Sequence, residues 1–131
     1  MSLAPKLLAV AALLALTPTA QAAPASVSAA ELAAYPALRA ARVKADAVAV
    51  SKGAAKMEQG EAGFTEALAA AGWTAERYTE VDGVVEDVLA TLKEMDAAPA
   101  KAAELRKALL GQVDAATVER IRKDRKALER R

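Results

Sequence analysis

One short segment constrains the fold most, because it contains a helix end, a turn and the start of the best-patterned helix. Gly72 can adopt the left-handed backbone conformation that ends a helix without steric cost. In such a cap, Leu68 packs against Trp73, the residue that follows Gly72. Thr74 is placed to cap the following helix. Tyr78 lies where a hydrophobic staple with Trp73 forms. We expect Trp73 to hold two helix ends together; the alternative is an exposed tryptophan that binds a partner.

The helix expected from about 75 to 95 carries an apolar stripe with spacings of three and four residues, formed by Tyr78, Val81, Val85, Val88, Leu92 and Met95. Val84 and Leu89 widen this stripe. It covers about two and a half heptads, fewer than the three or four that indicate a coiled coil. The stripe therefore favours packing within the chain, and we expect a monomer or a weak homodimer.

The composition indicates that the rest of the chain is helical as well. Alanine supplies more than a quarter of the residues, while aromatic residues make up 3%, a balance that favours helix over strand. With no cysteine, stability comes from packing without disulfides. We expect an all-α fold: one domain over residues 23–131, a small bundle of four to five helices with antiparallel neighbours and short loops.

The first 22 residues have the layout of a secretory signal peptide. Lys6 precedes an apolar run from 7 to 16, and Pro18 and the small-residue pattern Ala-Gln-Ala at 20–22 follow. The run is shorter than the ~20 residues that span a bilayer. We expect cleavage after Ala22, a periplasmic or secreted protein and no stable membrane span after cleavage; an uncleaved anchor is the alternative.

Helix boundaries in the first half follow from caps and breakers. After a leader without periodicity at 23–27, Ser28 and Glu31 form a capping box. Pro36 lacks the amide donor, so we expect a break or kink with a fresh start there. Beyond it, a helical face carries Leu38, Ala41, Ala45 and Val48, with Val43 and Val50 beside it. This helix ends near Lys52 or continues to Met57.

Later boundaries rest on glycine, proline and aspartate. The two glycines within 58–63 predict a loop, followed by a short helix at 64–71 that buries Phe64, Leu68 and Ala71. Pro99 opens a helix that runs to Gly111 with Leu105 and Leu109 on its inner face. Asp114 then caps one last helix that carries Val118, Ile121 and Leu128 on one face, with the charge pairs Glu119–Lys123 and Arg125–Glu129 outside.

Residue types exclude most enzyme classes. The chain has no histidine and no cysteine, and so lacks the usual general base, the thiol nucleophile and the common ligands of zinc and haem. It has no phosphate-binding glycine loop and no serine–lysine dyad of the required spacing. A carboxylate pair needs a deep cleft, which a thin alanine-rich bundle supplies poorly. We expect no enzyme activity, no catalytic residue, no cofactor and no metal site.

Charge is unevenly distributed. Removal of residues 1–22 leaves 17 basic and 17 acidic residues, yet residues 58–96 alone carry ten acids and two bases. Five of these acids lie along the helix from 75 to 95, at Glu76, Glu80, Asp82, Glu86 and Asp87. Weak cation binding is one interpretation of this acidic face. The other is that it packs against the protein's own basic ends, and the sequence favours the second, because Glu80-Val-Asp82-Gly83 does not fit a calcium loop.

The basic C-terminus, from Arg120 to Arg131, lacks interleaved aromatic residues for nucleic acid and a bulky apolar face for membrane insertion. We therefore expect a solvated helix surface here and no nucleic-acid partner.

The pattern Phe64-x3-Leu68-x3-Gly72-Trp73-Thr74-x3-Tyr78 resembles one found in small exported bacterial all-helical proteins of uncharacterised function, over roughly residues 64–95. The resemblance implies an exported helical domain and carries over no site residue. We expect a non-enzymatic cell-envelope protein that acts through protein contacts with another envelope protein. The alternatives are a carrier or sensor that binds a small apolar or cationic ligand between helices, and a holdase-like periplasmic chaperone.

Overall fold

The computed structural model describes residues 23–52 and 54–129, and the expected signal peptide lies outside these ranges. The fold is all-α, as predicted. It has six α-helices in the described ranges, more than the four to five expected: α2 (Ala29–Lys52), α3 (Ala54–Ala71), α4 (Ala75–Ala97), α5 (Ala102–Gln112), α6 (Ala115–Lys123) and α7 (Arg125–Glu129), with the 3₁₀ helix η2 (Pro99–Lys101) before α5.

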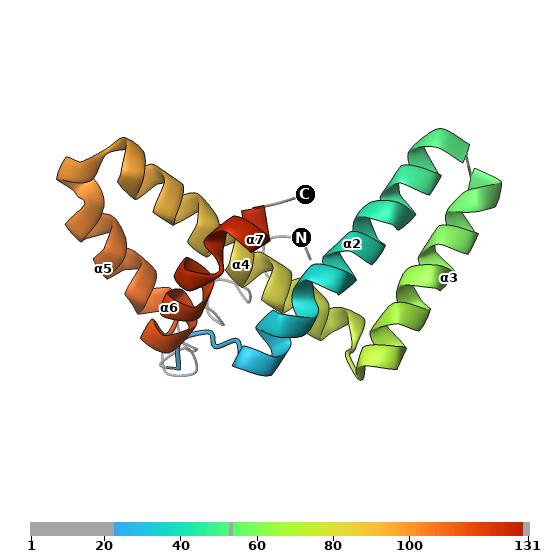
Figure 1. Ribbon diagram of the computed structural model, residues 1–131, viewed down its shortest axis with the longest axis horizontal. Coiled ribbons are helices and arrows are strands. Elements are labelled where there is room, and N and C mark those ends of the chain that lie inside the picture. The colour runs from blue at the N-terminus through green and yellow to red at the C-terminus, as the bar shows by residue number, and fades with distance from the viewer. Residues whose placement is uncertain (1–22, 53, 130–131) are drawn as a thin grey trace, which may run out of the picture.

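The helices form two arms that diverge from a shared base (Figure 1). Antiparallel α2 and α3 make one arm, and α4, after crossing the base, makes the other arm with α5. The short helices α6 and α7 lie between the arms, so that α7 faces the first part of α2 (Figure 1). None of the helices described is both long and apolar enough to cross a membrane.

The glycine junction between α3 and α4 has the predicted geometry. Gly72 has a φ of 78°, and the Trp73 amide donates to the Leu68 carbonyl at 2.9 Å while the Gly72 amide donates to the Ala69 carbonyl at 3.0 Å. These two bonds are those of a Schellman cap. Thr74 accepts from the Arg77 amide at 3.0 Å and caps α4. Local residue chemistry therefore determines this turn.

Helix α2 begins as predicted but does not break where predicted. Ser28 and Glu31 form the reciprocal capping box, with bonds of 3.0 and 3.1 Å. The expected break at Pro36 is wrong, because α2 continues through it to Lys52. Proline costs the helix one backbone hydrogen bond, but Leu32, Tyr35 and Leu38 are buried on both sides of it. Their packing holds the chain helical across the missing bond.

The loop expected at 58–63 is also wrong, because α3 is continuous from Ala54 to Ala71. A Cβ built on Gly60 would lie 3.1 Å from the Ala45 carbonyl oxygen and 3.2 Å from the Ala45 Cα. Gly60 thus lets the backbones of α2 and α3 approach closely, a tertiary use of glycine that local propensity does not reveal. Phe64 and Leu68 are buried as expected, whereas Ala71 is exposed.

The core follows the predicted stripe of α4. Tyr78, Val81, Val85, Val88 and Leu92 are buried, and Met95 packs against them. The edge-to-face pair of Phe64 and Tyr78, with ring centroids 5.0 Å apart, joins α3 to α4. On α2 the inner face keeps Leu38 and Ala45 buried. Val43 and Val50, placed beside that face from the sequence, are instead 49% and 88% exposed.

Residues 25–27, expected to be part of a featureless leader, are built into the fold. Ala25 forms an isolated parallel bridge with Val113, and Val27 is 1% exposed. The Val27 amide donates to the Thr117 hydroxyl and its carbonyl accepts from Arg120, both at 2.9 Å. We call residues 25–27 the N-terminal strap. It joins the start of the described chain to α6.

The C-terminal helical part begins where predicted but ends differently. Asp114 caps α6 as predicted, accepting from two backbone amides. The expected single helix is divided at Asp124 into α6 and α7, which brings Leu128 into the core at 4% exposure. The predicted Arg125–Glu129 pair is present at 3.4 Å, while Glu119 pairs with Arg122 and not with Lys123.

Candidate functional site

A polar cluster joins α2 to α4 at the base of the arms. The Tyr35 hydroxyl donates to Asp82 at 2.5 Å, and the Arg39 guanidinium donates to the Tyr35 oxygen at 2.8 Å and to Asp82 at 2.9 Å. Arg39 also lies 2.6 Å from a Glu86 carboxylate oxygen. The cluster therefore pairs the acids of α4 with a base of α2, and the Tyr35 ring stacks on that of the buried Tyr78.

The two tyrosines of this region are held in the neutral form. Burial, followed by the hydrogen bond to Asp82, raises the pKa of Tyr35 well above its ordinary value. Burial likewise raises the pKa of Tyr78 to about 12. Neither phenol can lose its proton near neutral pH. The two phenols therefore act in this region as neutral groups, and that of Tyr35 donates a hydrogen bond.

The five acids of the predicted acidic face do not form one face. Asp82 and Glu86 turn toward α2 and contact Arg39, while Glu80 lies 4.0 Å from Arg77. Glu76 and Asp87 are exposed. Within the described residues no group of three or more potential metal ligands lies close enough to hold an ion. The interpretation in which the acids pair with the protein's own bases fits Asp82 and Glu86.

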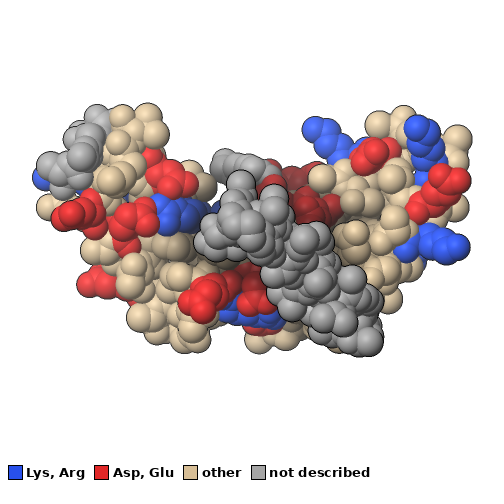
Figure 2. Space-filling model, turned by 180° about the vertical axis from the view of Figure 1, so that it is seen from behind, with Lys and Arg blue, Asp and Glu red and all other residues tan. Residues whose placement is uncertain are grey.

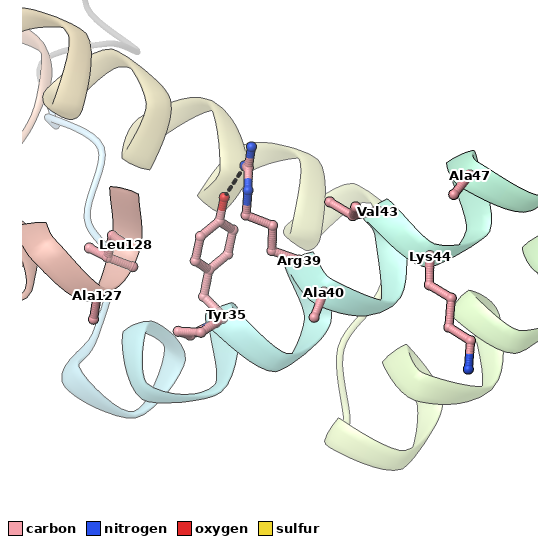
Figure 3. Close-up of a pocket in the computed structure, with 9 residues that line it drawn as sticks. Tyr35, Arg39, Ala40, Val43, Lys44, Ala47, Ala127 and Leu128 are labelled. Atoms are coloured by element: carbon pink, nitrogen blue, oxygen red, sulfur yellow. Dashed lines mark hydrogen bonds between the residues drawn. The ribbon is translucent and has the colours of Figure 1, made fainter. Parts of the chain in front are cut away.

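Sequence reasoning missed a groove between α2 and α7. It has a volume of about 280 Å³, and Tyr35, with the stem of Arg39, forms one side of it (Figure 3). Ala127 and Leu128 come from α7, and further along α2 the groove is lined by Val43 and Ala47 (Figure 3). Almost all of this lining is apolar. The groove lies in the notch between the arms.

Along α2 the groove continues as an exposed apolar stripe. The residues recur at spacings of four, three, four and three, and each is exposed: Pro36, Ala40, Val43, Ala47 and Val50. We call these five residues the α2 stripe. The spacing is that of a heptad seam. The same spacing is visible in the sequence, but α2 also carries a second apolar face, which is the buried one. Only burial distinguishes the two faces.

One lysine lines the groove, and a second precedes a lining residue in the sequence. Lys44 of α2 lines it and extends toward the side of α2 that faces α3 (Figure 3). Lys126 of α7 is exposed and directly precedes Ala127. Acids on these two helices are engaged elsewhere: Asp46 pairs with Arg42, and Glu129 pairs with Arg125. Lys44 and Lys126 thus have no ion-pair partner among the described residues, whereas the exposed acids Asp46 and Glu129 each pair with an arginine.

The opposite face of the molecule differs in charge. Figure 2, seen from behind, shows acidic side chains on the α2–α3 arm, and a mixture of basic and acidic side chains at the base and toward the outer end of the α4–α5 arm. Exposed bases in that part of the chain are Lys93, Lys101, Arg106 and Lys107. None of these four bases lines the groove.

Trp73, the other candidate contact residue, is half-buried and packs against the core. This placement agrees with its predicted role at the helix junction. No contact surface comparable to the α2 stripe surrounds it in the described residues: the exposed large apolar side chains are Val43, Val50 and Met57, all on the α2–α3 arm. The groove and its stripe are therefore the candidate site. Comparison of the chain with protein-family models, with curated proteins and with solved structures found no match.

Proposed function

We propose that this chain is a non-enzymatic protein of the cell envelope that acts by binding another protein through the α2 stripe. The observation that carries the proposal is the exposed apolar seam on α2, with Val43 at 49% and Val50 at 88% exposure. Exposed apolar surface that is contiguous and bordered by charge is typical of interaction sites. A heptad seam is the pattern by which one helix packs along another.

The remaining features support a binding role over catalysis. The polar cluster beside the groove has its tyrosines in the neutral form, and the acids Asp82 and Glu86 are paired with Arg39. The envelope location rests on the signal-peptide layout of residues 1–22. Mass spectrometry of the chain recovered from the periplasm of expressing bacteria tests that location, with an N-terminus at Ala23 as the expected result.

A stripe variant tests the binding role. Val43→Asp places a charge on the seam without disturbing the core, because Val43 is exposed. Met57→Asp, on α3 with 43% exposure, is the matched control. We expect the wild type and Met57→Asp to retain the same stoichiometric protein from envelope extract and Val43→Asp to lose it, with all three chains showing equal thermal unfolding. The proposal is contradicted if Val43→Asp retains the protein, or if none of the three chains retains one.

A second candidate function is binding of a small apolar ligand in the groove. Its volume of about 280 Å³ lies near the lower end of ligand pockets, which are about 300–1,000 Å³ and mainly apolar. Thermal-shift screening of the chain against fatty acids and apolar amines distinguishes the two. A reproducible rise in melting temperature that Leu128→Ala abolishes would favour the ligand, while an unchanged melting temperature leaves the protein-contact function.

A further inference from the structure

We propose that the partner of the α2 stripe is an amphipathic helix with carboxylates along the edges of its apolar face. This inference rests on the proposed function and specifies the chemistry of the partner. It depends on three observations: the length and spacing of the stripe, the small size of its side chains, and the basic groups at its borders.

The stripe has the dimensions of a helix-packing surface. Its five residues extend over 15 positions of α2, from Pro36 to Val50, or ~21 Å at the rise of an α-helix. Alanines at positions 40 and 47 alternate with valines at 43 and 50, so a second helix can approach closely and insert its larger side chains above the alanines. Leu128 and Ala127 on α7 supply a second wall at one end. A peptide that binds by strand addition would need an open sheet edge, and the described residues contain none.

Charge at the borders selects an acidic partner. In the heptad of the stripe, Lys44 occupies a flanking position next to Val43, where interhelical ion pairs form. Lys126 stands on the α7 side, and neither lysine takes part in an ion pair within the described residues. The neighbouring acids Asp46 and Glu129 are already paired. Carboxylates on an incoming helix therefore meet the unpaired Lys44, whereas lysines on it would have to compete with Arg42 for Asp46.

A second copy of this chain fits the stripe poorly. Two α2 helices packed antiparallel about Val43 would place the two Lys44 side chains at the same border. Packed in parallel, Lys44 of one copy would face Arg39 of the other, because these positions are five residues apart in the flanking register. Arg39 is already paired with Asp82 and Glu86, so the antiparallel alignment brings like charges together and the parallel one gives Lys44 no carboxylate of its own. The stripe is therefore suited to a different chain.

Two designed peptides test the charge preference on the full chain. Both are helices of about 18 residues with leucine at the seam positions; one carries glutamate at the flanking positions and the other carries lysine. Fluorescence anisotropy at low salt is expected to show the acidic peptide binding about tenfold more tightly or better, with the difference reduced at high salt. Lys44→Glu should remove or reverse that preference. Lys107→Glu, an exposed lysine on α5, is the matched control and should preserve it.

The outcomes separate this inference from the proposed function. Equal binding of both peptides, or a preference for the basic one, overturns the acidic partner and leaves the stripe as a protein-binding surface. If neither peptide binds and sedimentation equilibrium shows a dimer that Val43→Asp dissociates, the occupant is a second copy and the inference is wrong. If neither peptide binds and the chain is a monomer, the acidic helix is the wrong occupant, and the pull-down with Val43→Asp decides the proposed function separately.

Discussion

At the residue scale, single side chains and single backbone conformations determine where helices begin and end. Ser28, Thr74 and Asp114 each accept hydrogen bonds from amides at a helix start. Gly72 ends α3 with a positive φ. Each of these interactions involves residues within a few positions of one another, so each could be predicted from the sequence. The turn at Gly72 provides the sharpest test.

Gly72→Ala is expected to lower the free energy of unfolding by about 1 kcal/mol, because a φ of 78° disfavours any residue with a Cβ. The new methyl group meets no neighbouring atom within 4 Å, so the cost comes from backbone strain alone. Gly83→Ala, inside α4 and equally free of close neighbours, is the control. Helix propensity predicts that it stabilises. Urea unfolding measures both, and a neutral Gly72→Ala would mean that the turn relaxes.

At the scale of elements, the approach of α2 to α3 depends on one glycine and on the groups around it. Arg42 of α2 lies over the Phe64 ring, 4.5 Å from its centroid, and pairs with Glu61 of α3. Gly60 allows the two backbones to come close enough for these contacts. Two glycines of α3 can therefore be used to compare helix propensity with packing.

Gly60→Ala and Gly63→Ala are expected to change stability in opposite directions. A Cβ at Gly60 would lie 3.1 Å from a backbone oxygen of α2, and overpacking against backbone costs about 1–3 kcal/mol. That cost exceeds the roughly 0.5–1 kcal/mol gained from helix propensity. A Cβ at Gly63 meets nothing within 4 Å, so only the gain remains. Equal stabilisation by both changes, in thermal or urea unfolding, would show that α2 can move away.

The pair Glu31–Arg77 joins the start of α2 to α4 and predicts a pH dependence. The hydrogen bond from Arg77, opposed by burial and aided by Ser28, lowers the pKa of Glu31 from 4.5 to about 2. A depressed pKa in the folded state stabilises the fold above the unfolded value. This contribution is complete above about pH 4.5 and is lost as the pH falls toward about 2.

Glu31→Gln should reduce the loss of stability between these two pH values, since glutamine can keep the capping hydrogen bond but cannot titrate. Glu66 is an exposed glutamate on α3. Glu66→Gln is therefore the control and should leave the loss of stability at acid pH (the acid limb) unchanged. Urea unfolding at a series of pH values measures the effect. An identical acid limb in wild type and Glu31→Gln would show that other carboxylates dominate it.

At the scale of the whole molecule, the N-terminal strap ties distant parts of the chain together. Ala25 bridges to Val113, the Ser26 carbonyl accepts from Arg77, and Val27 bonds to Thr117 and Arg120. The strap thus connects the base of α4 with α5 and α6. Thr117 is fully buried, and its hydroxyl is the partner of the Val27 amide.

Thr117→Val is expected to destabilise the protein by about 1–3 kcal/mol, because it leaves a buried backbone amide without a hydrogen-bond partner. Thr79→Val is the control: that hydroxyl is exposed and bonds to a carbonyl of its own helix, so a change within about 0.5 kcal/mol is expected. Hydrogen exchange should show lost protection in α6 as well as at the strap. Loss confined to the strap would mean that it does not hold α6 in place.

Features that depend on residues close together in the sequence could be predicted, and features that depend on distant residues could not. The caps, the Gly72 turn and the α4 stripe are decided by residues within about two helical turns of one another. The helical course of 58–63, the passage of α2 through Pro36 and the burial of Val27 depend on partners up to 93 positions away, such as Arg120 for Val27. The groove belongs to this second group, since α7 contributes to it from the far end of the chain.

The sequence by itself determined the all-α class, the helix ends and the inward face of α4, because helix propensity, capping and apolar periodicity act over short distances. Only the tertiary structure decided that the second apolar face of α2 stays exposed. The face with Leu38 and Ala45 meets α3 and α4, and the α2 stripe with Val43 and Val50 is left to solvent. The physical reason is that burial requires a partner surface, and a partner surface exists only once the arms are assembled.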